Sequence, residues 1–321
     1  MAVEIVKEKW VNQVNELVIG ATKEQGGARE KPIKVGGEST LPFMFQEGEL
    51  PNRPVVAMEV WDTEPADWPD ILKAPFGASL KDPCEWAKKC VGDFQADLIC
   101  LALKSANPET KNTSPKETAE TVKKVLKAVG VPLIITGCGD KEKDNEVLAV
   151  CSQAAKGENC LFGVATQDNY KTLTASCMAD GHSIIAESPI DINIAKQVNI
   201  LITDMGFDAT KIAIDPTAGA LGYGMEYVYS IMERSRLAAL MGDKMLSMPF
   251  ILFVGNEVWR VKEATASQKD APAWGDPAKR GPLWEATTAV AMLQAGGDIL
   301  VMRHPEAVRS VKSTIEELMK K

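Results

Sequence analysis

Apolar runs alternate with amphipathic stretches eight times along most of this chain. The runs that can form fully buried strands are residues 54–60, 96–103, 131–137, 159–165, 182–188, 211–215, 249–255 and 298–304. Near-continuous apolar strands are typical of a parallel sheet that helices cover. Eight strand–helix units close most naturally into a (β/α)8 barrel. The sequence therefore predicts a TIM barrel.

The segments between the runs carry helix start and stop signals. Ser114-Pro115-Lys116-Glu117 is a capping box with proline at the first helical position, and Gly130 marks the end of that helix. Asp82-Pro83 begins a second helix, and Ser188-Pro189-Ile190-Asp191 begins a third that Gly206 ends. An open doubly wound sheet is the alternative fold, but no G-x-G-x-x-G motif follows the first strand.

Two segments lie outside the regular alternation. Residues 1–53 form an N-terminal extension before a barrel domain that we expect over residues 54–321. Within the extension, Gly36-Gly37 separates two short extended runs, which predicts a β-hairpin with its turn at the glycines. The second segment, residues 257–285, is a long loop after the seventh strand.

The loop at residues 257–285 contains Trp259, Trp274 and Trp284 among prolines and charges. Interspersed tryptophans suit a partner surface or a large flat ligand. The alternative is that these rings only pin the loop to the barrel, and the sequence favours neither interpretation.

Charge and composition exclude several functions. The net charge of −8 argues against nucleic acid as a main partner, because phosphate binding needs a basic surface. The N-terminus has no apolar signal region and no run approaches the length of a membrane span, so we expect a cytoplasmic protein without membrane contact. Seven cysteines without a C-x-x-C pair and only two histidines predict no zinc ribbon, no iron–sulfur cluster and no histidine-rich metal site.

Function in a TIM barrel gathers where the strands end. The residues at these positions are rich in hydroxyl and amide groups, and IAIDPTAGALGYG (212–224) adds three glycines to one of the loops. Such a rim can hydrogen-bond a large polar ligand at many points. We expect the binding residues to be Thr136, Gly137, Cys138, Gly139, Ser188, Asp191, Asn193, Asp215, Pro216, Thr217, Gly219 and Asn256.

Several of these candidates have a structural alternative. Asp62 and Asp215 can act as general acids or bases, or they can cap the loops that follow them. Cys138 lacks an obvious neighbouring base, so nucleophilic catalysis is disfavoured. His182 begins the fifth strand at the stability-related end of the barrel, whereas His304 lies at the productive end and remains a candidate.

Four segments carry a resemblance to one family. They are IKVGGESTLPFMFQEGELPNRPVVAMEVWD (33–62), TGCGDKEKDNEVL (136–148), ATQDNYKTLTASC (165–177) and IDPTAGALGYGMEY (214–227). Through them the chain resembles the small subunit of the corrinoid iron–sulfur protein and its archaeal counterpart, the delta subunit of the acetyl-CoA decarbonylase/synthase complex. The resemblance extends over essentially the whole chain.

The resemblance implies a dihydropteroate-synthase-like TIM barrel that pairs with a larger subunit. That large subunit is expected to bring a [4Fe–4S] cluster, and a cobamide is expected at the junction of the two. The cobalt takes a methyl group from methyltetrahydrofolate through a separate methyltransferase and delivers it to carbon monoxide dehydrogenase/acetyl-CoA synthase. This chain is then a methyl carrier of the reductive acetyl-CoA pathway, without catalytic residues or metal ligands of its own.

Two other functions stay open from the residues. One is a stand-alone methyltransferase that binds a pterin in the barrel mouth, since IDPTAGALGYG looks like the D-P-G-x-G-F-G-K turn of pterin-binding barrels. The lysine of that turn is absent here, because Met225 follows Gly224. The other is a scaffold whose barrel mouth contacts only protein. The D-x-H-x-x-G pattern of corrinoid proteins that supply a lower cobalt ligand also fails, with Ile185 in place of its glycine.

Overall fold

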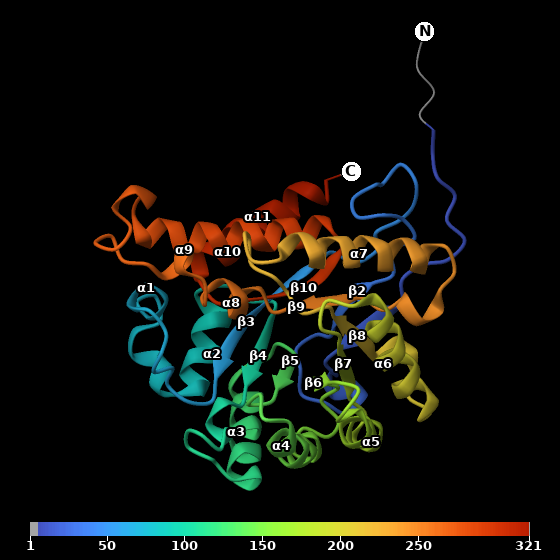
Figure 1. The fold of residues 1–321 in the computed structure, drawn as a ribbon. Coiled ribbons are helices and arrows are strands. Elements are labelled where there is room, and N and C mark those ends of the chain that lie inside the picture. Colours follow the sequence, from blue (N-terminus) through green and yellow to red (C-terminus); the bar gives the residue numbers. More distant parts are fainter. Residues whose placement is uncertain (1–5, 321) are drawn as a thin grey trace.

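The computed structural model describes residues 6–320 and contains eight parallel strands closed into a barrel (Figure 1). Neighbouring strands follow the order β10-β3-β4-β5-β6-β7-β8-β9. The strands are β3 (Val55–Trp61), β4 (Leu98–Ala102), β5 (Leu133–Thr136), β6 (Leu161–Ala165), β7 (Ser183–Glu187), β8 (Ile212–Asp215), β9 (Phe250–Leu252) and β10 (Gly297–Met302). Each falls in or at one of the eight apolar runs, so the predicted TIM barrel is confirmed.

Helices surround the strands on the outside of the barrel (Figure 1). The α-helices are α1 (Asp70–Lys73), α2 (Pro83–Gly92), α3 (Pro115–Ala128), α4 (Lys141–Ala154), α5 (Tyr170–Asp180), α6 (Ile192–Asp204), α7 (Met225–Leu240), α8 (Val254–Val258), α9 (Lys262–Thr265), α10 (Pro277–Gln294) and α11 (Pro305–Leu318). Short 3-10 turns are η1 (Lys23–Gln25), η2 (Gly77–Lys81), η3 (Lys104–Ala106), η4 (Ala209–Lys211), η5 (Lys244–Leu246) and η6 (Pro272–Trp274).

The predicted caps begin these helices. Ser114 Oγ accepts a hydrogen bond from the Glu117 amide, and the Glu117 carboxylate accepts one from the Ser114 amide, which completes the capping box of α3. Asp82 caps α2, and Asp191 caps α6. The capping side chains act within a few residues of themselves, which is why the sequence located these starts.

The N-terminal extension contains an antiparallel hairpin, as predicted, but its turn is elsewhere. Strand β1 (Glu16–Ile19) pairs with β2 (Ile33–Gly36), so residues 20–32 connect them. The prediction that Gly36-Gly37 makes the turn is wrong. These glycines have φ of 78° and 85°, and a Cβ on Gly36 would lie 2.2 Å from the Asn15 carbonyl oxygen. Their backbone conformation lets the chain turn at the end of β2 while it passes close to Asn15.

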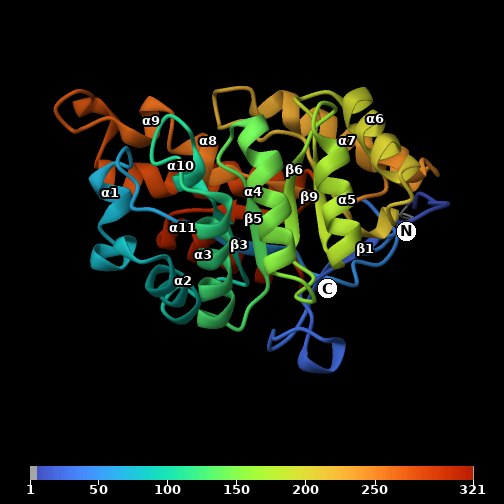
Figure 2. The same cartoon turned by 90° about the horizontal axis from the view of Figure 1, so that it is seen from below.

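The hairpin closes the amino-terminal end of the barrel. Leu17, Ile19 and Val35 are fully buried and share one apolar cluster with the inward-facing residues of the barrel strands. Asn159, just before β6, donates its side-chain amide to the Val18 carbonyl at 2.9 Å. In Figure 2 the connecting segment of the hairpin (blue) lies at the end of the barrel opposite α8 and α9. The hairpin does not cover the carboxyl end of the barrel, where a ligand can therefore bind. The predicted boundary at residue 53 between the N-terminal extension and the barrel domain stays a prediction.

The seventh barrel strand is shorter than predicted. Strand β9 ends at Leu252, and α8 begins at Val254, so the expected run at residues 249–255 is strand only in its first part. Asn256 therefore lies on a helical turn at the barrel mouth. Its Oδ1 accepts a hydrogen bond from Arg303 Nη2 at 3.1 Å, which holds that turn against β10.

Candidate functional site

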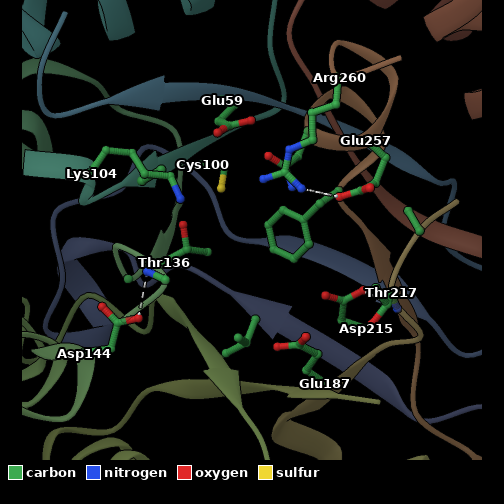
Figure 3. Close-up of a pocket in the computed structure, with 17 residues that line it drawn as sticks. Glu59, Cys100, Lys104, Thr136, Asp144, Glu187, Asp215, Thr217, Glu257 and Arg260 are labelled. Carbon is green, nitrogen blue, oxygen red and sulfur yellow. Dashed lines mark hydrogen bonds and ion pairs between the residues drawn. The ribbon is translucent and has the colours of Figure 1, made fainter. Parts of the chain in front are cut away.

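A cavity of about 320 Å³ opens at the carboxyl ends of the strands (Figure 3). Polar side chains from β3, β5, β7 and β8, from α4 and α8, and from the segments that follow β4, β8 and α8 line it. Its lining residues are Glu59, Cys100, Ala102, Lys104, Thr136, Gly137, Gly139, Asp144, Val164, Glu187, Asp215, Thr217, Ala218, Phe253, Asn256, Glu257 and Arg260. A volume of this size is at the small end of ordinary ligand pockets.

The structure brings half of the predicted binding residues together around this cavity. These are Thr136, Gly137, Gly139, Asp215, Thr217 and Asn256. Six others lie behind or beside the lining, namely Cys138, Ser188, Asp191, Asn193, Pro216 and Gly219. Ligand contact remains a prediction for all twelve.

Some of the predicted binding residues outside the lining have structural roles instead. Asp191 accepts hydrogen bonds from the amides of Asn193 and Ile194 at the start of α6. A Cβ on Gly219 would lie 2.8 Å from the backbone carbon of Gly224, so this glycine serves a turn that packs on itself. The glycines of the segment 212–224 thus shape its own backbone.

The turn Gly137-Cys138-Gly139 is filled by a side chain of the protein. Asp144 on α4 accepts hydrogen bonds from the amides of Cys138, at 2.7 Å, and Gly139, at 3.0 Å. These two amides are therefore not free to bind a phosphate. Burial raises the pKa of the Cys138 thiol to about 12, which keeps it protonated at neutral pH. A nucleophilic role for Cys138 finds no support in this geometry.

A buried ion pair that the sequence analysis did not single out lies under one wall of the cavity. Arg303 Nε and Nη2 donate to the Glu59 carboxylate at 2.7 and 3.0 Å, and each side chain is 5% exposed. The guanidinium also lies over the rings of Trp61 and Trp68. One signal was available, because Glu59 is the only charged residue in an otherwise apolar strand.

The opposite wall carries two carboxyl groups that form no ion pair within residues 6–320. Glu187 and Asp215 are register partners at the ends of β7 and β8. Burial, followed by the charges of Glu187 and Glu257, raises the pKa of Asp215 well above its ordinary value. Burial also raises the pKa of Glu187, and Lys141 opposes this shift.

The mouth contains more charged side chains than expected, since the sequence indicated a rim of mainly amide and hydroxyl groups. Five carboxyl groups and two cations line it: Glu59, Asp144, Glu187, Asp215 and Glu257, with Lys104 and Arg260. The sequence did not indicate this, because the charges come from different strands and loops. Arg260 pairs with Glu257 at 3.3 Å. Within residues 6–320, Lys104 Nζ makes no hydrogen bond or ion pair and points toward the cavity in Figure 3.

Neither histidine lines the cavity. His182, at the opposite end, has Nδ1 and Nε2 engaged with the Cys160 amide and the Ser152 carbonyl. His304 caps α11 through Nδ1, which accepts from the Glu306 amide, and its ring stacks on another aromatic ring. Burial lowers the pKa of His304 to about 4, so the ring is neutral. Both histidines therefore have structural roles.

The tryptophan-rich segment 257–285 is largely fixed to the barrel, and its last part is the start of α10. Trp259 is 5% exposed and donates Nε1 to Glu285 at 2.8 Å, while Trp284 donates to a carbonyl in the β8–α7 loop. Trp274 is 43% exposed. Two of the rings thus pin the segment, and Trp274 faces solvent.

Residues 6–320 contain neither a cluster of metal ligands nor a membrane-spanning helix. No three His, Cys, Asp or Glu side chains within residues 6–320 are grouped so that they could hold a metal ion. No helix in that same range is both long and apolar enough to cross a membrane.

Comparison with solved structures identifies the same fold elsewhere. Dihydropteroate synthase from Xanthomonas albilineans, in complex with 7,8-dihydropteroate, superposes with a TM-score of 0.56 over 88% of this chain and 100% of that chain, at 12% identity. The Coxiella burnetii dihydropteroate synthase in complex with pteroic acid gives a TM-score of 0.56 over 88% of this chain and 99% of that chain, also at 12% identity. At these identities the likeness shows the fold alone.

Sequence comparison gives a closer relationship. The acetyl-CoA decarbonylase/synthase complex subunit delta of Methanosarcina mazei is 38% identical over 315 residues, covering 97% of this chain and 72% of the relative. The corresponding subunit of Methanocaldococcus jannaschii is 37% identical over 306 residues, covering 95% and 74%. The sequence model of the CO dehydrogenase/acetyl-CoA synthase delta subunit matches residues 16–308. The chain therefore belongs to the CO dehydrogenase/acetyl-CoA synthase delta subunit family.

Proposed function

We propose that this chain is the small, non-catalytic subunit of a corrinoid iron–sulfur protein. In this role it carries a methyl group on a cobamide from methyltetrahydrofolate:corrinoid methyltransferase to acetyl-CoA synthase in the reductive acetyl-CoA pathway. The observation that carries the proposal is membership in the delta subunit family over residues 16–308. We also propose a cytoplasmic location, and the seven free cysteines, six of them buried, are in keeping with a reducing compartment.

The mouth of the barrel fits a cobamide that lies across it. A corrin ring is too broad to enter a cavity of about 320 Å³, so its face would rest on the rim while smaller groups enter. The polar side chains of the lining, such as Thr136, Asn256 and Asp215, suit the amide groups around a corrin. A ring held in this way keeps a second face for a partner, which favours a site shared with the large subunit.

The protein groups also fit a cobalt without a histidine from this chain. His182 lies at the closed end of the barrel, and His304 caps a helix. When bound, the cobamide supplies the cobalt that holds the methyl group; the residues of this chain orient the ring and exclude water from one of its faces. We expect the [4Fe–4S] cluster on the large subunit.

The test is anaerobic purification of this chain with and without the large subunit. We expect cobamide absorbance mainly in the complex. Replacing Asp215 with Ala should lower the cobalt content of the complex, because the loss of roughly one hydrogen bond to a buried group raises the Kd for the cobamide by about tenfold. Unchanged cobalt content would remove Asp215 from the site.

The same preparation distinguishes the alternative. A stand-alone pterin-binding methyltransferase would bind methyltetrahydrofolate stoichiometrically without any partner. That result with the isolated chain, together with no cobamide in the complex, would overturn the carrier proposal. Exposed Glu226 on α7 offers a matched control, since Glu226→Gln removes one carboxylate outside the cavity lining.

A further inference from the structure

The carboxyl pair of Glu187 and Asp215 is held by the barrel itself. The two residues are aligned across neighbouring parallel strands, so their side chains emerge on the same side of the sheet at the same height. Both line the mouth cavity. In Figure 3 their carboxyl groups occupy one side of the cavity, and Lys104 lies on the opposite side.

Asp215 is unusual because it is both buried and incompletely bonded. It is 5% exposed, and its Oδ1 accepts a hydrogen bond from the Thr217 amide at 2.9 Å. No hydrogen bond from residues 6–320 reaches its second oxygen, and that carboxyl faces the cavity in Figure 3. Glu187 has no hydrogen bond or ion pair in the same range of residues. A buried polar group that faces a cavity without a partner indicates a ligand.

The surroundings decide what protonation state this pair has. Burial raises the pKa of Asp215 well above its ordinary value, and the carboxylates of Glu187 and Glu257 add to this effect. Lys141 is the cation that acts on Glu187, but it is engaged with Asp168 at 2.5 Å. The remaining charged groups of the lining are Glu59, Asp144, Lys104 and Arg260. Burial and the neighbouring negative charge both favour the protonated form of Asp215, because like charges at short range oppose each other's ionisation.

A carboxylic acid beside a carboxylate offers one O–H donor and one set of acceptor oxygens. A primary amide offers the complementary set, with a carbonyl oxygen and an NH2 group on one carbon. An organic ammonium offers donors only, and a carboxylate ligand offers acceptors only. A metal ion is disfavoured, because no group of three ligand side chains exists among the described residues.

We propose that Asp215 and Glu187 form a recognition site for a primary carboxamide group that enters the mouth cavity. Asp215 donates its O–H to the amide oxygen, and Glu187 accepts a hydrogen bond from the amide NH2. This inference rests on the proposed function, since amides fringe the corrin that we place across the mouth. It adds that this pair selects for the neutral amide of the ligand.

The test uses the full chain and small probes, with binding followed by saturation-transfer NMR. Propionamide is compared with propylamine, which is an ammonium ion at neutral pH, and with propionate. We expect propionamide to bind with the lowest Kd of the three. Asp215→Ala and Glu187→Ala should each raise its Kd by about tenfold, while the exposed control Glu226→Gln leaves it unchanged.

A conservative variant and a pH profile give the sharper signature. Asp215→Asn keeps an N–H donor for the amide oxygen, so its Kd for propionamide should stay within about threefold of the original. Binding to the original chain should weaken as the pH rises and Asp215 loses its proton, whereas binding to Asp215→Asn should not change with pH. These two results separate amide recognition from a merely structural role of Asp215.

Tighter binding of propylamine, stronger propionamide binding at high pH, or alanine variants that bind as well as the original chain would each overturn the inference. So would the absence of propionamide binding. Failure here and failure of the proposed function are distinguishable. If the complex holds cobamide but the chain does not recognise the amide, only this inference is contradicted. If the chain recognises the amide but the complex holds no cobamide, only the carrier role is contradicted.

Discussion

Replacing Glu59 with Gln should strongly destabilise the barrel. In the original chain the Arg303 guanidinium makes two charge-assisted hydrogen bonds to Glu59, at 2.7 and 3.0 Å, and both side chains are 5% exposed. The substitution leaves a buried guanidinium whose acceptors are neutral, namely the Gln oxygen and Asn256 Oδ1. Breaking a buried pair from one side costs about 3–5 kcal/mol. We expect about 3 kcal/mol, since the amide oxygen still accepts one hydrogen bond.

The effect should depend on pH with a definite sign. Burial opposes ionisation of Glu59, but Arg303 and the Trp61 indole outweigh it, so the pKa of Glu59 lies below 4.5 in the folded chain. A lowered pKa contributes stability that is present above the unfolded pKa and is lost as the pH falls through the folded one. The difference between the original chain and Glu59→Gln should therefore shrink in acid below about pH 4.

The assay is urea unfolding followed by circular dichroism. Glu85→Gln is a matched control, because Glu85 pairs with Lys88 at 2.8 Å but the two side chains are 59% and 52% exposed. That control should cost less than about 0.5 kcal/mol. Replacing both Glu59 and Arg303 with Met should cost less than Glu59→Gln alone, because no charge is then left unpaired. A loss below about 1 kcal/mol for Glu59→Gln would refute the reasoning from burial.

Three further predictions concern other parts of the barrel. Leu17→Ala in the hairpin should lower the free energy of unfolding in urea by about 3 kcal/mol, while Val11→Ala, at a residue that is 79% exposed, should lower it by almost nothing. Equal effects would mean that the hairpin does not seal the core. The pKa of His304 is lowered to about 4, so stability should fall as the pH drops from about 6.5 to about 4, and His304→Asn, which keeps a capping side chain, should flatten that profile. Trp259→Phe removes the hydrogen bond to a buried glutamate and should lower the free energy of unfolding by about 1–2 kcal/mol, whereas Trp274→Phe should change it by no more than about 0.5 kcal/mol. The reverse order would mean that Trp274 anchors the segment.

Much of the fold could be predicted because its signals are local. The eight apolar runs marked the barrel strands, and capping residues such as Ser114 and Asp191 satisfy amides two or three residues away. Where a signal depended on a partner far along the chain, the prediction was wrong. Gly36-Gly37 resembles a hairpin turn in the sequence, but Gly36 is the last residue of β2 and pairs with Glu16 of β1.

The candidate site could be predicted only in outline. Strand ends were located, and half of the expected residues line the cavity, among them Thr136 and Asn256. The sequence could not show that Asp144 occupies the amides of the Gly137-Cys138-Gly139 turn, because that contact depends on how α4 packs. It also could not show that the mouth gathers five carboxyl groups from separate elements.

The sequence by itself determined the strand–helix alternation, the helix starts and the family of this chain, since these depend on neighbouring residues and on residue identity. The tertiary structure decided which charges meet. Closure of the barrel places β10 beside β3, so Arg303 reaches Glu59 across 244 positions of sequence. Register between β7 and β8 likewise sets Glu187 beside Asp215. Such pairs arise from chain closure and strand register, which bring together side chains that no local pattern connects.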